Sequence, residues 1–223
     1  MNKNDRTIKL YKYTSLPVLL DILHEKKLVL LDPLTWEDRN DSYYLKKYKE
    51  LVCMRTVLAL CFTMKSERFH HWKVFAGDIS GVCILFYKDK LLRSFANDQH
   101  IMMDKVTYCT VKHLMNQHPP VDKLPFIKRA PYSDEEEFRI IYKDKGSEIS
   151  SKEFRIDLSS IARIKLNPWM PLPLVKSVEK TIRSINGCSG FNISQTTLLE
   201  NDTWKNIANS LAGKPDRSPR YWK

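Results

Sequence analysis

Apolar residues gather in short runs along the chain, and these runs predict the strands of a sheet. The run over residues 57–63 is continuous, which is typical of a strand buried on both faces. The run over residues 81–87 has the same character, and a shorter one over 28–31 ends at Asp32 and Pro33. Further strand-like runs lie over residues 105–110, 138–142, 154–158 and 161–166.

Between these runs, apolar residues recur at the spacing of amphipathic helices. Thr14, Ser15 and Pro17 indicate a helix start, and leucines at positions 16, 19, 20 and 23 then fall on one face. The strongest pattern lies over residues 173–186 and is stopped by Gly187. Further helices are expected over residues 44–52, 67–76 and 202–211. Because strands and helices do not alternate regularly, the pattern predicts an α+β fold, a single mixed-sheet domain with flanking helices.

The 223 residues, 43% of them hydrophobic, suffice for one large domain. We expect that domain over residues 1–213, followed by a basic tail over 214–223. No apolar run approaches the roughly 20 residues that span a bilayer, and the N-terminus leads into no apolar signal core. Five cysteines without a C-x-x-C pair indicate reduced thiols in a cytoplasmic protein, rather than a disulfide or metal framework.

The net charge of +11 favours polyanionic partners, either nucleic acid or nucleotides. The basic residues are spread along the chain, so a general basic surface is as good an explanation as a dedicated groove. The tail over residues 214–223 carries Tyr221 and Trp222, which could stack on bases, although a frayed, solvated end explains it equally.

Standard catalytic signatures are absent from the sequence, including the P-loop, G-x-G-x-x-G, H-E-x-x-H and G-x-S-x-G motifs. His70 and His71 are adjacent, and on a helix their side chains diverge by about 100°. With no second histidine or carboxylate at ligand spacing, the sequence predicts no metal site.

Three segments place polar side chains at the edges of predicted strands. They are L-Y-K-Y-T-S at residues 10–15, C-F-T at 61–63 and E-E-E-F-R at 135–139. Together with P-L-T-W-E-D-R-N-D at 33–41, H-W-K-V-F-A at 71–76 and G-V-C-I-L-F at 81–86, their order resembles the bacterial family called domain of unknown function 2971. The resemblance covers residues 8 to about 145, and the chain departs from it at Thr63 (serine in the family) and Phe75 (tyrosine). That family has no settled activity.

The same segments are more distantly similar to the ADP-ribosyltransferase superfamily, in the class with an R-S-E pattern. That class has a basic residue on its first core strand, a serine or threonine on a second strand, and an E-x-E or Q-x-E motif on a later one. The resemblance implies Lys12 as the basic residue and Thr63 as the hydroxyl. It implies Glu135 and Glu137 as the E-x-E pair, and NAD as the substrate.

This resemblance implies a chemistry that suits the residue types. Cleavage of the nicotinamide–ribose bond passes through an oxocarbenium-like state, which Glu137 would stabilise while Glu135 positions or deprotonates the acceptor. Lys12 would neutralise the pyrophosphate, and Tyr13 or Trp72 would stack on a base. Lysine in place of arginine weakens the match, because it lacks the bidentate fork for phosphate.

Each of these residues also has a structural explanation. Lys12 could lie solvated between two inward tyrosines, Thr63 could simply end a strand, and Trp72 could pack in the core. The acidic run over residues 134–137 could be an exposed turn paired with Arg139. Three functions therefore stay open. The first is an ADP-ribosyltransferase-like or NAD-cleaving enzyme, in phage defence or as a toxin effector. The second is a non-catalytic nucleic-acid or nucleotide-binding module, and the third is a structural or partner-binding protein.

Overall fold

The computed structural model describes residues 8–212, and its element order is that of an α+β fold. The strands are β1 (Lys9–Ser15), β2 (Lys27–Leu31), β3 (Thr56–Thr63), β4 (Gly81–Tyr87), β5 (Ile101–Lys105), β6 (Thr107–Cys109), β7 (Ile127–Arg129), β8 (Glu137–Asp144), β9 (Ser151–Arg155), β10 (Ile161–Leu166) and β11 (Ile193–Gln195). The helices are α1 (Leu16–Glu25), α2 (Arg39–Leu51), α3 (Phe69–Phe75), α4 (Lys88–Leu92), α5 (Val111–Asn116), α6 (Leu172–Ser184) and α7 (Asp202–Ala212). The short 3-10 turns are η1 (Pro33–Thr35), η2 (Val121–Phe126), η3 (Ala130–Glu135) and η4 (Leu158–Ser160).

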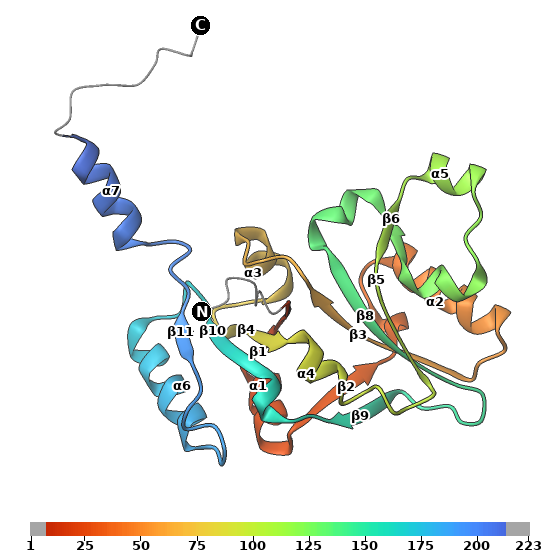
Figure 1. The fold of residues 1–223 in the computed structure, drawn as a ribbon, viewed down its shortest axis with the longest axis horizontal. Coiled ribbons are helices and arrows are strands. Elements are labelled where there is room, and N and C mark those ends of the chain that lie inside the picture. Colours follow the sequence, from red (N-terminus) through yellow and green to blue (C-terminus); the bar gives the residue numbers. More distant parts are fainter. Residues whose placement is uncertain (1–7, 213–223) are drawn as a thin grey trace, which may run out of the picture.

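Nine of the described strands form one mixed sheet, whose layout can be followed in Figure 1. One part runs β11-β10-β4-β1 and the other contains β3, β8 and β5, all paired antiparallel except β10 with β11. The two parts meet where β1 pairs with β3, and that pairing is confined to Tyr11 opposite Thr63. The sheet is thus joined at a single register position, close to the predicted site residues.

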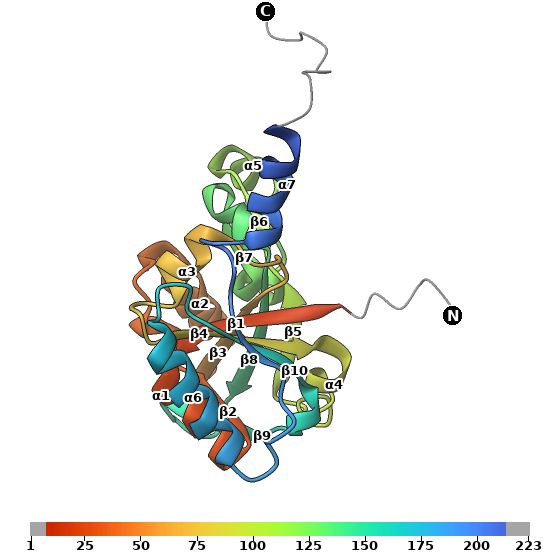
Figure 2. The ribbon, with the colours of Figure 1, turned by 90° about the vertical axis from the view of Figure 1, so that its left-hand side faces the viewer.

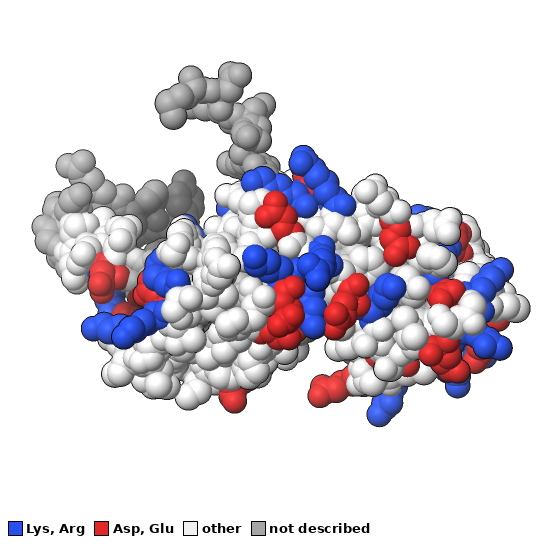
Figure 3. Space-filling model, turned by 90° about the horizontal axis from the view of Figure 1, so that it is seen from below, with Lys and Arg blue, Asp and Glu red and all other residues white. Residues whose placement is uncertain are grey.

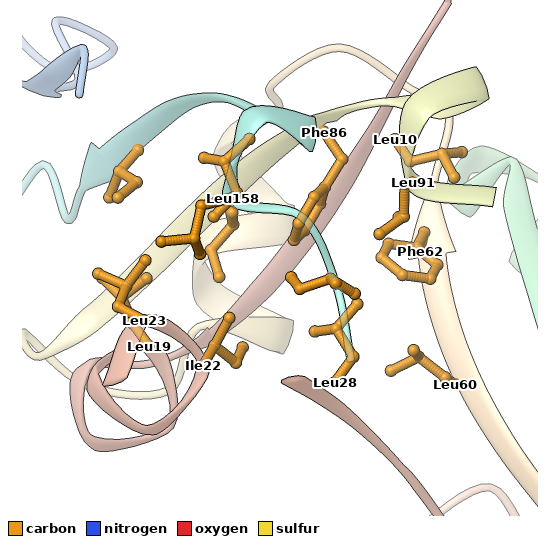
Figure 4. Close-up of a cluster of buried hydrophobic side chains, with 14 of the residues drawn as sticks. Leu10, Leu19, Ile22, Leu23, Leu28, Leu60, Phe62, Phe86, Leu91 and Leu158 are labelled. Carbon is orange, nitrogen blue, oxygen red and sulfur yellow. The ribbon is translucent and has the colours of Figure 1, made fainter. Parts of the chain in front are cut away.

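Side chains of alternate parity separate cleanly onto the two faces of this sheet. Even-numbered residues of β1, β3, β4 and β8 build the largest apolar cluster, together with α1 and α6. Figure 4 shows Leu10 and Phe62 beside Leu91 on one side of this cluster, and Leu19 and Leu23 of α1 on the other. Odd-numbered residues face α2 and α3 and join two smaller clusters around Tyr48 and Trp72. We call the first the large-core face and the second the small-core face.

Most of the predicted elements are present, and the mixed α+β class is confirmed. Asp38 caps α2, since its carboxylate accepts hydrogen bonds from the backbone nitrogens of Asn40 and Asp41. The strand expected over residues 105–110 is wrong, because the chain divides at Val106 into β5 and β6, which belong to different sheets. The strand expected over 154–158 ends earlier, at Arg155, and a 3-10 turn follows.

Other features bear on the remaining expectations. All five cysteines are free thiols, and Cys83, Cys109 and Cys188 are buried. Among the described residues, no helix is long and apolar enough to cross a bilayer. Helix α7 stands away from the body in Figure 1, whereas in the turned view of Figure 2 it overlaps α5 and β6. The tail over residues 214–223 lies outside the described residues.

Candidate functional site

The small-core face carries a row of three side chains across the junction of the sheet. Tyr11 of β1 lies opposite Thr63 of β3, and Thr63 lies opposite Glu137 of β8. Residues directly opposite each other in antiparallel strands project to the same face. Thr63 and Glu137, which the sequence analysis singled out separately, are therefore neighbours, and both are buried.

Lys12 does not join this row, so the expected convergence of Lys12, Thr63 and Glu137 is wrong. Because successive side chains of a strand alternate, Lys12 points to the large-core face when Tyr11 points to the small-core face. Its Nζ lies 5.9 Å from the centroid of the Phe62 ring. Burial there lowers the pKa of Lys12. Lys12 is thus separated from Glu137 by the thickness of the sheet.

The Thr63 hydroxyl is occupied by backbone partners rather than presented to solvent. It donates a hydrogen bond to the carbonyl oxygen of Glu135 and accepts one from the backbone nitrogen of Lys65, 2.9 Å away. Thr63 is 7% exposed. Its side chain therefore fixes the backbone of the acidic triplet Glu135-Glu136-Glu137. This geometry favours a structural role for Thr63 over direct contact with a ligand.

The acidic triplet is bent by a left-handed residue at its centre. Glu136 has φ 41° and ψ 53°, a conformation that side chains other than glycine and asparagine seldom adopt. It sends the Glu136 carboxylate to Lys65, while Glu135 and Glu137 both turn to Lys128. The outer two carboxylates are thereby brought to one ammonium group, 2.6 Å from Glu135 Oε2 and 3.3 Å from Glu137 Oε2.

The buried guanidinium of Arg139 also binds the Glu137 carboxylate. Its Nε donates to Glu137 Oε1 at 2.6 Å and its Nη2 to Glu137 Oε2 at 2.8 Å. The same guanidinium binds both carboxylate oxygens of Asp41, with 2.8 Å between Nη1 and Oδ1. Nη1 also donates to the carbonyl oxygen of Pro125. Arg139 is fully buried, so its charge is neutralised entirely by these partners.

The two outer carboxylates of the triplet have pKa values displaced in opposite directions. Burial alone would raise the pKa of Glu137, but Arg139 and Lys128 outweigh it and lower that pKa to about 2. For Glu135, burial has the larger effect and its pKa is raised, despite Lys128. Such a divergent pair is typical of sites in which one carboxylate stays ionised while the other exchanges a proton.

A cavity of about 230 Å³ opens beside this ion network. Asp41 and Lys128 belong to both the network and the cavity wall, which Arg129, Tyr44 and Ile127 also line. Pockets that enclose a drug-sized ligand measure about 300–1,000 Å³, so this one could take only part of a dinucleotide. A wider hollow of about 510 Å³ lies along residues 93–100 and includes none of the candidate residues.

The aromatic residues expected to stack on a base have different surroundings. Trp72 is fully buried, and its indole Nε1 donates to Glu67 Oε1 at 2.7 Å, so the prediction that it stacks on a base is wrong. Tyr13 packs edge-on against Trp72, with 5.2 Å between ring centroids, and has a buried hydroxyl without a hydrogen-bond partner. Tyr13 is only partly buried, so of the two aromatic residues only Tyr13 exposes part of its side chain for stacking on a base.

The residues that hold the carboxylates together were missed as a group by the sequence analysis. Asp41 appeared only within the segment at residues 33–41 and Arg139 only as the partner of an exposed turn, whereas Lys128 was not singled out. Asp41 and Arg139 are 98 positions apart in the sequence. A signal was present in Arg139 itself, a charged residue inside the apolar strand β8, which requires a buried counter-charge.

Comparisons with known proteins give a limited result. No family model matches the chain, so its resemblance to the domain of unknown function 2971 stays a prediction, and no curated protein matches it either. Among solved structures, DarT of Thermus sp. 2.9 in complex with NAD+ is similar at a TM-score of 0.45 and 10% identity, over 86% of this chain and 96% of that one. The same protein in complex with ADP-ribosylated ssDNA is similar at a TM-score of 0.44 and 11% identity, over 87% and 97%. Similarity at this level carries no inference about activity.

Proposed function

We propose that this chain is an ADP-ribosyltransferase-like or NAD-cleaving enzyme whose reaction centres on Glu137 and Glu135. The observation that supports the proposal best is the divergent carboxylate pair: Glu137 stays ionised while Glu135 has a raised pKa, and both contact Lys128. An ionised carboxylate held in place is what an oxocarbenium-like ribose requires beside it. A carboxylate of raised pKa suits a general base.

Each residue has a defined part in this proposal. The bond between C1′ of the ribose and the nicotinamide nitrogen breaks, and its electron pair leaves with neutral nicotinamide. Glu137 stabilises the positive charge on the sugar, while Glu135 takes the proton of the attacking acceptor or water. Lys128 is bound more closely to Glu135 than to Glu137. A shift of Lys128 away from Glu137 Oε2 would leave that oxygen with Arg139 Nη2 as its one donor among the described residues, so that it could also accept from a ribose hydroxyl.

The cation that binds the pyrophosphate has to come from a residue other than Lys12. Arg129 follows Lys128 on β7 and lines the same cavity. It forms no ion pair with any carboxylate of the described residues, so its guanidinium is available for a bidentate contact with phosphate. We assign to Arg129 the role that the sequence analysis gave to Lys12.

The test is release of nicotinamide from NAD by the purified protein, with and without single-stranded DNA or a cell extract as the source of acceptor. Glu137→Gln is expected to abolish release, and Glu135→Gln to lower it at least about tenfold, in the range of general-base effects. Glu148→Gln is the matched control, because Glu148 is exposed and lies beyond the end of β8 opposite to Glu137. No release under any condition, or full activity of Glu137→Gln, would refute the proposal.

A non-catalytic nucleotide-binding or nucleic-acid-binding module is the second candidate, and one observation favours it. Both oxygens of Glu137 are already engaged by protein cations, and the residue is 5% exposed. This candidate predicts binding that weakens steeply with salt and no nicotinamide release. On the face seen in Figure 3, lysine and arginine are interspersed with acidic residues, so the described residues of that face form no continuous basic surface for a nucleic acid.

A role in phage defence or as a toxin effector belongs to the same proposal and rests on the sequence resemblance. It predicts that expression of the wild-type chain slows growth of a bacterial host and lowers its NAD content, whereas Glu137→Gln does neither. Normal growth and unchanged NAD with the wild type, at expression equal to that of the variant, would count against the toxin role.

A further inference from the structure

His70 and His71, which the sequence analysis set aside as metal ligands, are joined in the fold by a third potential ligand. Asp134 lies in η3, immediately before the acidic triplet, and its Oδ2 contacts His70 Nε2. The same oxygen is 4.0 Å from His71 Nε2. One ligand atom from each of the three residues lies within 4.8 Å of the others. The expectation that no carboxylate lies near the histidine pair is therefore wrong.

The two imidazoles lie closer together than helical divergence suggested. Both occupy the first turn of α3, and their ring centroids are 4.6 Å apart at an interplanar angle of 81°. His71 turns inward against Tyr13 and Phe75, while His70 stays 54% exposed beside Asp134. Helix α3 thus presents one buried and one accessible imidazole to the same carboxylate.

His71 supplies an independent reason to look for a ligand at this position. It is fully buried, and neither of its ring nitrogens has a hydrogen-bond partner. Buried polar groups are nearly always paired, and an unpaired one costs about 1–3 kcal/mol. A metal ion at Nε2 would satisfy one of the two nitrogens.

We propose that His70, His71 and Asp134 form a site for one Zn²⁺ ion, with a fourth position left to water. Two imidazoles and one carboxylate are a ligand set that zinc uses in open, three-ligand sites. Ligands at about 2.0–2.1 Å from a tetrahedral ion lie roughly 3.3 Å from each other. To reach that spacing, His71 and Asp134 must approach by less than an ångström, and His70 and Asp134 must separate by a similar amount. The ligand atoms of the two histidines lie within 4.8 Å of each other and are brought to the same spacing by the ion.

The bound ion would connect α3 to the segment that leads into Glu135 and Glu137. Asp134 is adjacent to Glu135, whose backbone carbonyl accepts the Thr63 hydroxyl. Zinc would thus fix η3 at a second point and stabilise the folded chain. His70 and Asp134 are both about half exposed, which gives the ion a path from solvent. This site is independent of NAD chemistry, and its test requires no substrate.

The test is calorimetric titration of Zn²⁺ into the full chain, freed of any histidine tag and stripped of metal with a chelator. We expect one ion per chain, with a rise in the thermal unfolding midpoint on binding. His70→Ala and Asp134→Ala, both at exposed positions that the fold tolerates, should weaken binding at least about tenfold. His118→Ala, on an exposed loop and not a member of the cluster, should leave binding unchanged.

The outcomes separate this site from the proposed enzyme. Absence of binding by the wild type, or binding that both His70→Ala and Asp134→Ala leave intact, would overturn the zinc site. Neither result would bear on nicotinamide release, which is measured on Glu137 and Glu135 variants. Conversely, zinc binding of the expected stoichiometry in a protein that never cleaves NAD would support the site and count against the enzyme alone.

Discussion

Arg139→Met tests whether Glu137 is held ionised by the buried guanidinium. The pKa of Glu137 lies at about 2, against an ordinary value of 4.5. A lowering of that size corresponds to about 3 kcal/mol of stabilisation, at ~1.36 kcal/mol for each pKa unit. Removal of one partner from a buried ion pair costs about 3–5 kcal/mol, because the remaining charge has no compensation. We therefore expect Arg139→Met to lower the free energy of unfolding by about 3–4 kcal/mol at pH 7.

The pH dependence gives a second, signed readout of the same interaction. In the wild type the pKa of Glu137 is lowered, so its contribution is complete above about pH 4.5 and is lost as the pH falls toward 2. Asp41 has the opposite sign, since burial raises its pKa, and it reduces the net loss in acid. In Arg139→Met, burial is left to raise the pKa of Glu137. The variant should therefore recover stability as the pH falls from 7 to 5.

The assay is urea unfolding followed by circular dichroism at pH 7, 5 and 4, with the slope against urea required to stay constant. Lys47→Met is the control, since it removes an exposed ion pair with Glu50 and should leave the unfolding free energy close to that of the wild type. Arg139→Met/Glu137→Gln should be more stable than Arg139→Met alone, because no glutamate charge is left buried. A loss below about 1 kcal/mol for Arg139→Met, with an unchanged pH profile, would refute the reasoning.

Three further predictions concern positions around the site. Lys12→Met should keep or raise the free energy of unfolding and leave nicotinamide release unchanged, because burial already disfavours the ammonium group; a loss of activity would place Lys12 back in the site. Gly81→Ala should lower the unfolding free energy by about 1–3 kcal/mol, since an added Cβ would lie 2.3 Å from a carbonyl oxygen at the end of α3, while Gly190→Ala, with no atom within 4 Å, should be neutral. Trp72→Phe should cost about 1–3 kcal/mol in urea unfolding through the lost hydrogen bond to Glu67, and equal stability would show that this bond contributes nothing.

The sequence was sufficient for the elements with a strong local pattern. Strands β3 and β4 are continuous apolar runs, and α6 has apolar residues at helical spacing with Gly187 beyond its end. Strands β7 and β11 have three residues each and were not predicted, because such short strands are defined by their partners rather than by their own periodicity.

The candidate site was only partly predictable for a related reason. The alternation of side chains along a strand places Lys12 and Tyr11 on different faces of the sheet, but it does not say which of the two shares a face with Thr63. That depends on the register between β1 and β3, which rests on one pair of residues. Similarly, the approach of Asp134 to the histidine pair depends on tertiary packing across more than sixty positions of the chain, which no local pattern encodes.

The left-handed backbone at Glu136 has a consequence for how this chain can vary. One torsion, φ 41°, sets the distance between the two chemically distinct glutamates, while the middle side chain only reaches Lys65 at the periphery. Glycine or asparagine at position 136 would preserve the spacing without the charge, whereas valine or isoleucine would keep the chain length and force the neighbours apart. The central glutamate thus acts as a spacer: its charge can be replaced, but its left-handed backbone conformation cannot.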